Sequence, residues 1–404
     1  MTDASYKWVV LAAGGLIGCV AMGMLFSLPV FLDPLTSQTQ WSRTGVSSAM
    51  TLAFLVMGFA GFGWGALSDR IGPVLIVMTG SLVLTIGLYL LSLVNALWQF
   101  QAIFGFVLAI AVAAFLAPMM ACVTGWFTSN RGLAVSLVSA GIGLAPMTMS
   151  PLVAWLLETY EWRTCYQIMA LIALATTLPL SFLIRRPPPD EALAPSSAAA
   201  LSSSRGLTAR QALMSRPFMI LAITNFFCCA THSGPIFHTV SYAISCGIPV
   251  VTAVTIYSVE GLAGMGGRIG FGLAGDRFGA KRMLVAGLMA QAIGAMGYYY
   301  AHSLTAFYSA AIVFGFVYAG IMPLYAVLIR ENFPQRIMGA LIGGTGLAGS
   351  LGMATGPVLG GWIYDQTGAY GGLYIACAVL GLCAMAIATT FRPVVAPPGA
   401  AATI

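Results

Sequence analysis

Long apolar runs dominate the chain, and Pro, Gly, Asn or charged residues separate one run from the next. Most runs are long enough to cross a bilayer, since a spanning helix needs about 20 apolar residues. The pattern therefore predicts an all-α membrane protein with 12 transmembrane helices. We place them near 8–32, 44–67, 73–94, 97–127, 132–157, 164–184, 217–244, 251–274, 283–301, 304–329, 338–363 and 370–391.

One long polar stretch, from Arg185 to Arg216, divides these spans into two sets of six. It begins Arg-Arg-Pro-Pro-Pro-Asp-Glu and continues with Ser and Ala, which is the composition of a linker. We expect an N-terminal six-helix bundle over 1–186, a cytoplasmic linker over 187–216 and a C-terminal six-helix bundle over 217–404. Within the linker, Thr208 could cap a short helix that lies on the membrane surface.

Composition and charge agree with this architecture. The chain is 59% apolar and 7% charged, whereas soluble domains average about 25% charged residues, so a soluble enzyme or nucleic-acid-binding protein is disfavoured. If both termini are cytoplasmic, the inner loops hold fourteen of the 17 Lys and Arg residues. The positive-inside rule supports this topology, and it explains the net charge of +6 without a nucleic-acid partner. We expect a multi-pass protein of the cell (plasma or inner) membrane.

An internal repeat relates the two sets of spans. Gly65-Ala-Leu-Ser-Asp-Arg-Ile-Gly72 follows the second span, and Gly272-Leu-Ala-Gly-Asp-Arg-Phe-Gly279 follows the eighth, 207 residues later. A second match at nearly the same offset aligns Pro118, Arg131 and Pro151 with Pro323, Arg336 and Pro357. Two matches in register indicate two pseudo-symmetric bundles made from a duplicated unit, as in transporters with parallel repeats.

The residues also carry a family resemblance. The paired Gly-x-x-x-Asp-Arg-x-Gly loops, Trp126-Phe-Thr-Ser-Asn-Arg-Gly132 and Glu161-Trp-Arg163 resemble the major facilitator superfamily. Lys7-Trp-Val-Val10, Ser42-Arg-Thr44 and Gly267-Arg-Ile-Gly270 are similar to the monocarboxylate transporters and their bacterial relatives that exchange oxalate for formate. The resemblance covers the whole chain and implies a transporter.

The repeated loops suggest a gate. A carboxylate at the end of the second span could pair with a neighbouring arginine or with the positive end of a helix, and such contacts are weak enough to open. A solvated turn that merely obeys the positive-inside rule is the alternative. The residues that we expect to take part in gating are Asp69, Arg70, Arg131, Asp276, Arg277 and Arg336.

Arg268 is the clearest charge deep within a span. An arginine at mid-membrane costs about 2.5–3.5 kcal/mol on insertion scales and normally faces a cavity or a partner. Its planar guanidinium suits bidentate binding of a carboxylate. In the family that the chain resembles, the arginine of the eighth helix binds the substrate carboxylate, and Arg268 matches that position. A structural salt bridge or a snorkelling side chain is the alternative.

Two residues are candidates for carrying a proton. Glu260 lies eight residues before Arg268, and a carboxyl group withdrawn from water can hold a proton. The family places an aspartate one turn before the arginine, where this chain has Gly264, so the role does not transfer directly. In the seventh span His238 is a better candidate than His232 for contact with substrate or proton, although a packed, hydrogen-bonded histidine is the commoner arrangement.

Other residues could complete a binding site between the two halves. Tyr257 shares a helix face with Arg268, and Tyr318 and Tyr325 share a face of the tenth span; aromatic stripes of this kind are also common in packing. The first half offers no deep charge, which suggests an apolar wall opposite the polar one. The remaining candidate substrate contacts, all in the first and fourth spans, are Ser27, Leu28, Phe115 and Met119.

These features together predict proton-coupled symport of a small monocarboxylate, of the lactate or pyruvate type, by alternating access. Exchange of organic anions, as in the oxalate and formate porters, is the alternative, and a non-transporting receptor is a third. Residues 339–363 contain no Lys or Arg, whereas a dicarboxylate would call for a second cation there. The expected partners are the anion, a proton and the lipid bilayer, with no enzyme activity, cofactor or metal; an accessory subunit stays open.

Overall fold

The computed structural model describes residues 3–127, 138, 143–185, 208–334 and 337–392, and no strand occurs among them. The first half contains α1 (Asp3–Phe26), α2 (Leu28–Thr39), α3 (Arg43–Ile71), α4 (Pro73–Leu91), α5 (Leu97–Ala102), the π-helical turn η1 (Ile103–Leu108), α6 (Ala109–Trp126), α8 (Ala145–Thr159) and α9 (Trp162–Ser181). The second half contains α10 (Ala209–Leu213), α11 (Arg216–Ser245), α12 (Val250–Phe278), α13 (Ala280–Tyr299), α14 (Leu304–Asn332), α15 (Met338–Thr367) and α16 (Gly371–Thr389).

The predicted fold class is confirmed: the chain is an all-α membrane protein whose long apolar helices fit the twelve-span, two-bundle layout. Two predicted spans consist of more than one helical segment. The first continues from α1 into α2 and forms an apolar stretch over Tyr6–Thr39, and the fourth consists of α5, η1 and α6. The beginning of the fifth predicted span lies outside the described residues, and α8 forms its second part.

The break between α1 and α2 has a local cause. Pro29 occupies the first turn of α2, and proline removes a backbone donor and cannot continue the preceding helix. The Ser27 hydroxyl donates a hydrogen bond of 2.8 Å to the backbone oxygen of Met24. The chain therefore changes direction at residue 27 while its backbone oxygens keep a partner.

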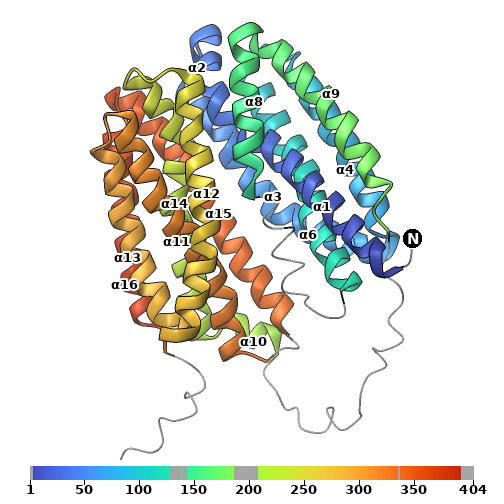
Figure 1. The fold of residues 1–404 in the computed structure, drawn as a ribbon, viewed down its shortest axis with the longest axis vertical. Coiled ribbons are helices and arrows are strands. Elements are labelled where there is room, and N and C mark those ends of the chain that lie inside the picture. Colours follow the sequence, from blue (N-terminus) through green and yellow to red (C-terminus); the bar gives the residue numbers. More distant parts are fainter. Residues whose placement is uncertain (1–2, 128–137, 139–142, 186–207, 335–336, 393–404) are drawn as a thin grey trace, which may run out of the picture.

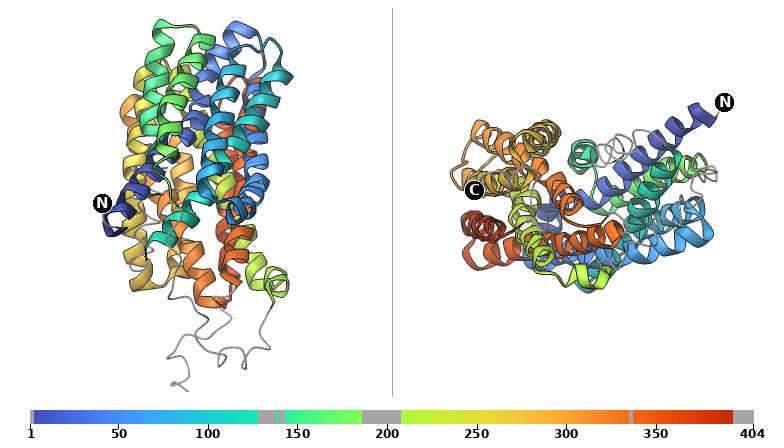
Figure 2. Two further views of the ribbon diagram at one scale, coloured as in Figure 1. Left: turned by 90° about the vertical axis from the view of Figure 1, so that its right-hand side faces the viewer. Right: turned by 90° about the horizontal axis from the view of Figure 1, so that it is seen from below.

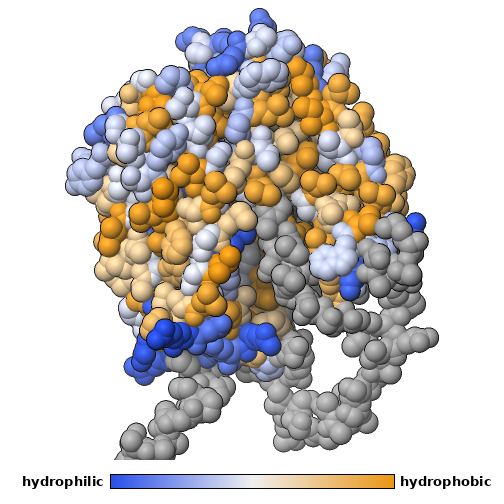
Figure 3. Space-filling view, in the orientation of Figure 1, coloured by the Kyte–Doolittle hydropathy of each residue, from blue (hydrophilic) through white to orange (hydrophobic). Residues whose placement is uncertain are grey.

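The two halves stand side by side (Figures 1 and 2), with α1–α9 in one and α11–α16 in the other. We call the end of the bundle where α3 begins the Arg43 end, and the end where α12 finishes the Arg277 end. The short helix α10, capped by Thr208, lies at the Arg277 end (Figure 1). On the face shown in Figure 3, apolar residues cover the middle and polar residues lie mainly at the two ends. This distribution is the one that a bilayer requires.

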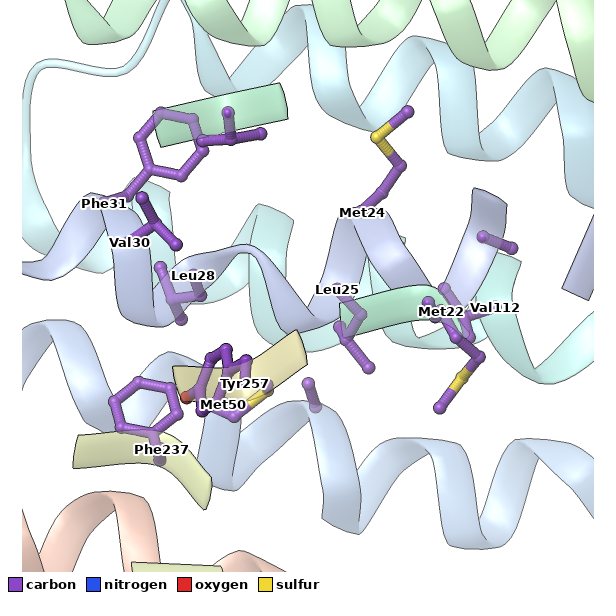
Figure 4. Packing of buried hydrophobic residues seen from close by; sticks show 14 of the residues in the cluster. Met22, Met24, Leu25, Leu28, Val30, Phe31, Met50, Val112, Phe237 and Tyr257 are labelled. Atoms are coloured by element: carbon purple, nitrogen blue, oxygen red, sulfur yellow. The ribbon is translucent and has the colours of Figure 1, made fainter. Parts of the chain in front are cut away.

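A continuous core joins the halves. The main cluster of buried apolar residues includes members of both, among them Leu25, Leu28 and Met50 from the first half and Phe237 and Tyr257 from the second. Figure 4 shows these side chains in one layer of packing. The halves therefore pack against each other through α3 and α15, α8 and α12, and α2 and α11.

Within the second half, α12 and α14 approach each other through glycine. A Cβ atom at Gly267 would overlap the backbone oxygen of Phe316, and a Cβ atom at Gly315 would meet the backbone of Glu260. Small residues allow membrane helices to pack this closely. The close approach fixes the positions of Glu260 and Arg268, which lie on the same helix.

We expect Gly267→Ala to lower the stability of the protein by about 1–3 kcal/mol, the usual cost of forcing an extra group into a packed interior. Thermal unfolding of the purified protein in detergent measures the change. Gly272→Ala is the matched control, because no atom lies within 4 Å of its Cβ position on the same helix. Equal melting temperatures for the two variants would contradict the close packing of α12 and α14.

Candidate functional site

A small cavity lies between the two halves, and we call it the central cavity. Its volume is about 40 Å³, which is room for one water-sized group. Its lining residues are Phe26, Gly143 and Pro146 from the first half and Ile236, Tyr257, Glu260, Gly261 and Tyr318 from the second. The cavity thus has apolar walls with a few polar groups, as ligand sites usually do.

Glu260 is the buried acid of this site, with 3% of its surface exposed. The Tyr298 hydroxyl donates a hydrogen bond of 2.9 Å to Glu260 Oε2. No other hydrogen bond and no ion pair to Glu260 occurs within the described part of the chain. A buried carboxylate without a cation is costly, so this environment favours the protonated, neutral form.

Two tyrosines line the central cavity beside Glu260. Tyr257 is 4% exposed, and its buried hydroxyl has no hydrogen-bond partner among the described residues. Tyr318, from α14, also lines the cavity. Sequence reasoning proposed both tyrosines, and the structure brings them together with Glu260.

Arg268 lies next to this cavity. Its two terminal nitrogens are 3.6 and 3.8 Å from the position that a Cβ atom would occupy at Gly143, and Gly143 lines the cavity. The guanidinium therefore faces the first half rather than its own bundle. Its side chain is exposed, and no carboxylate of the described residues lies within ion-pair distance of it.

The two histidines of α11 have different surroundings. The ring of His232 stacks on Tyr318 at a centroid distance of 5.0 Å, and Gln291 Nε2 donates a hydrogen bond of 3.1 Å to its Nδ1. Gln291 is itself oriented by contacts with the backbone oxygen and the Sγ of Cys228. Gln291 thus links His232 to Cys228 within the same buried group of polar side chains.

His238 is fully buried and lies away from the cavity. Its Nε2 is 2.9 Å from the backbone oxygen of Pro357 in α15, and its ring packs against Phe237 and Tyr370. The structure therefore places His232, rather than His238, beside the polar residues of the site.

Several other predicted substrate contacts lie in packed surroundings instead of lining the cavity. Phe115 packs near Gly80 of α4, and Met119 packs against Gly14 of α1. Leu28 is fully buried in the main core, and the Ser27 hydroxyl is engaged with its own backbone.

Tyr325 belongs to a separate apolar cluster of the second half. Its hydroxyl is buried and has no hydrogen-bond partner in the described ranges. The structure does not bring Tyr325 to the central cavity.

The predicted gating residues are placed only in part. Arg70, Asp276 and Arg277 are exposed at the Arg277 end, and the described residues contain no ion pair involving them. Arg131 and Arg336 lie outside the described residues, as does the side chain of Asp69. Their role in gating stays a prediction.

A polar cluster at the Arg43 end joins the halves, and sequence reasoning did not predict it. Asp365, near the end of α15, accepts hydrogen bonds of 3.2 and 2.8 Å from the backbone N–H groups of Arg43 and Thr44, the first residues of α3. A carboxylate suits a helix N-terminus, where N–H groups are unpaired and the dipole is positive. Asp365 of the second half therefore caps a helix of the first.

The Arg43 side chain strengthens this cluster. Its guanidinium pairs with Asp33 of α2, donates a hydrogen bond of 2.8 Å to the Tyr370 hydroxyl and lies 4.2 Å from the ring centre of Tyr364. Among the described residues, every side-chain hydrogen bond between the halves involves Arg43, Thr44 or Thr51 of α3. The signal in the sequence that could have indicated this cluster is that Asp33, Arg43 and Asp365 all lie at span ends on the same side of the membrane.

Sequence reasoning also missed the first-half wall of the cavity. Phe26, Gly143 and Pro146 supply it, at the break after α1 and at the beginning of α8. Proline and glycine near mid-span were the available signal, because such residues interrupt membrane helices where they line a site.

Comparison with known proteins agrees with this fold and site. The sequence profile of the Major Facilitator Superfamily matches residues 14–343 and 269–403. The chain therefore belongs to the Major Facilitator Superfamily, and it is a membrane transporter rather than an enzyme.

The curated relatives include several monocarboxylate transporters. The chain is 23% identical to Monocarboxylate transporter 13 of Rattus norvegicus over 396 residues, which is 96% of this chain and 89% of the rat protein. It is 27% identical to Monocarboxylate transporter 11 of Homo sapiens over 388 residues, with 91% of this chain and 79% of the human protein covered. Within the superfamily the chain thus resembles the monocarboxylate transporters.

Solved structures support the fold. The nucleoside transporter NupG superposes with a TM-score of 0.78 at 14% identity, covering 96% of this chain and all of NupG. A bacterial homologue of the human lysosomal transporter Spinster, in an inward-facing and unoccupied conformation, gives a TM-score of 0.75 at 15% identity, covering 95% of this chain and 96% of that one.

Asp365→Ala should loosen the first turn of α3, because the N–H groups of Arg43 and Thr44 lose a charged acceptor. Losing such a bond corresponds to roughly tenfold faster amide exchange, which hydrogen–deuterium exchange with mass spectrometry can measure in peptides covering residues 43–46. Glu158→Ala is the control, since Glu158 is also an exposed acid at the Arg43 end. Unchanged exchange in Asp365→Ala would refute the capping role.

Proposed function

We propose that this transporter carries small monocarboxylates, of the lactate or pyruvate type, together with a proton. It resides in the cell (plasma or inner) membrane, with the Arg277 end and both termini in the cytoplasm, as the positive-inside pattern favours. The observation that carries the proposal is Arg268, whose guanidinium lies beside a cavity between the halves without a carboxylate partner among the described residues. The monocarboxylate-transporting relatives support it independently.

Arg268 supplies the site for the anion. A guanidinium within a membrane span is expensive unless a cavity or an anion meets it, and its parallel N–H groups can bind both oxygens of a carboxylate. The bound pair is neutral overall. Neutralising the anion in this way lowers the cost of moving it through the low-dielectric interior.

Glu260 carries the proton in this proposal. Its burial, its one hydrogen bond within the described chain, from Tyr298, and its place on the cavity wall support that role. His238 is the weaker candidate, since its Nε2 contacts the Pro357 backbone and its ring is packed away from the cavity. Proton and anion bind to the same helix, α12, so one movement of that helix affects both.

Alternating access follows from the interface between the halves. In the described chain, the halves are hydrogen-bonded through the outer part of α3 at the Arg43 end, and Figure 1 shows them diverging toward the Arg277 end. Rocking of the two bundles would break the Arg43 cluster and close the opposite end. Asp69, Arg70, Arg131, Asp276, Arg277 and Arg336 are proposed to make the closing contacts there.

Exchange of organic anions is the alternative function. A dicarboxylate would favour two cations, but α15, which packs along α3 at the interface between the halves, contains no Lys or Arg. A monoanion therefore fits better. Uptake that requires anion preloaded inside liposomes would favour the exchanger over the symporter.

Arg268→Gln should reduce uptake of radiolabelled lactate into liposomes by at least about thirtyfold, because losing one partner of a charged pair costs about 2 kcal/mol or more. The variant should still fold, as judged by its thermal unfolding. Arg210→Gln, at an exposed position of α10, controls for the loss of one positive charge. Wild-type uptake by Arg268→Gln would overturn the proposed anion site.

Glu260→Gln should uncouple the anion from the proton. We expect wild-type uptake to rise when the outer medium is made acidic, because the proton enters with the anion, whereas uptake by the variant should not respond to the gradient. Lactate exchange at equal pH on both sides should continue in the variant. Glu158→Gln is the control, and a pH response retained in Glu260→Gln would exclude Glu260 as the carrier.

A further inference from the structure

A long groove opens on the side of the bundle where α3 of the first half meets the second half, and we call it the lateral groove. Its lining residues include Thr44 of α3, Phe226 of α11, Val358 and Trp362 of α15, and Leu380 of α16. Its volume is about 450 Å³, whereas that of the central cavity is about 40 Å³. The lateral groove is therefore large enough for a ligand of many atoms, and it is separate from the site on α12.

The surface of the lateral groove is apolar. Thr44 and Thr355 line it, but their hydroxyls are hydrogen-bonded within the protein. Thr44 Oγ1 donates a hydrogen bond of 2.5 Å to Asp365 Oδ2, and Thr355 Oγ1 donates one of 2.7 Å to the backbone oxygen of Gly352. Apolar cavities hold no ordered water, and burying a charged group against such a surface is costly. The lateral groove therefore suits an apolar ligand and not the carboxylate proposed for Arg268.

The length of the lateral groove matches one leaflet of a bilayer. A Cβ atom at Gly361 would meet the backbone of Thr44, and one at Gly352 would meet the backbone of Phe226, so these contacts bound the groove along α15. The two glycines are nine residues apart, which is about 14 Å along the helix axis. At the inner end, Leu380 is the central residue of α16. Since the hydrocarbon core is about 30 Å thick, the groove covers the depth of a single leaflet.

The surroundings of the lateral groove are those of lipid. Trp362, at the end nearer to Asp365, is 55% exposed, and tryptophan prefers the interface between lipid and water. Ile375 and Val379 of the adjoining α16 are apolar and also exposed. Because these helices span the membrane, their outer surface meets lipid chains rather than water. The lateral groove thus opens into the leaflet at the Arg43 end.

We propose that the lateral groove binds one acyl chain of a phospholipid from the leaflet at the Arg43 end. The chain enters beside Trp362 and ends beside Phe226 and Leu380 in the middle of the membrane. An empty groove forfeits the dispersion contacts of its lining atoms, and an alkyl chain restores them without needing a polar partner. Because α3 belongs to one half and α11, α15 and α16 to the other, the bound chain contacts both halves. This lipid site does not depend on which solute is transported.

Photo-crosslinking tests the site, with the purified protein in a steroid-based detergent, which has no alkyl chain to occupy the groove. The probe is a phosphatidylcholine that carries a diazirine near the end of one acyl chain. We expect label on peptides containing Phe226 or Leu380 to saturate, and at low lipid concentration to exceed label on the exposed α14 surface around Val313 by about tenfold. Lysophosphatidylcholine, which has one chain, should compete, whereas glycerophosphocholine, which has none, should not.

Val358→Phe fills the lateral groove with a ring from the protein itself, so label on the groove peptides should fall by about tenfold. Val313→Phe is the matched control, because the same change is made at an exposed position of α14 outside the groove, and it should keep the wild-type labelling. Thermal unfolding without lipid checks that both variants fold. Added phosphatidylcholine should raise the melting temperature of the wild type and of Val313→Phe, but not that of Val358→Phe.

The outcomes that would overturn the lipid site are distinct. Equal labelling of the groove and of the α14 surface in the wild type, or unchanged labelling in Val358→Phe, would show ordinary contact with surrounding lipid only. Competition by glycerophosphocholine would mean that a headgroup, and not a chain, is bound. If a second copy of the protein covers the groove instead, the groove peptides would take up no label and light scattering would show a dimer.

Discussion

An arginine inside a spanning helix, with no carboxylate partner among the described residues, is the constraint on which this structure depends. Arg268 occupies the middle of a spanning helix, beside the wall of the central cavity. Ionised groups in such surroundings persist only when a partner, a cavity or water compensates them. A protein carboxylate paired to Arg268 would stabilise the fold, but it would also compete with any anionic substrate. The separation of Arg268 from Glu260 along α12 avoids that competition.

The contacts between the halves follow a different principle. Arg43, Asp33 and Asp365 are charged and lie at the Arg43 end, and the Arg43–Asp33 pair is only partly exposed, so salt screens it less than a pair on the free surface. The apolar core around Leu28, Met50 and Tyr257 joins the halves through buried side chains, whereas the polar cluster joins them at the Arg43 end.

The sequence predicted the fold well because each spanning helix has to be apolar over its whole length. Most described helices begin and end within a few residues of the predicted ones, for example Leu304–Asn332 against 304–329, whereas α1 and α2 extend the first span from 8–32 to Asp3–Thr39. The depth of Arg268 and Glu260 was predictable for the same reason. The direction in which each side chain points could not be predicted. Helices that are apolar on every side show no periodicity that distinguishes cavity-facing residues from the others. The sequence analysis therefore predicted Phe115 and Met119 as cavity residues, whereas Phe26 and Gly143 line the cavity. The hydrogen bond between Asp365 and Arg43 joins residues more than 300 positions apart, so no local sequence pattern indicated it.

The most direct test of the proposed anion site compares two ligands that differ only in the group proposed to bind Arg268: a charged carboxylate in one and an uncharged amide in the other. Thermal unfolding of the purified protein is measured with increasing lactate and, separately, with lactamide, its uncharged amide. The account predicts that lactate raises the melting temperature in a saturable way, as a ligand that binds only the folded state must, and that lactamide at equal concentration does not. Equal stabilisation by both compounds would contradict an anion site at Arg268.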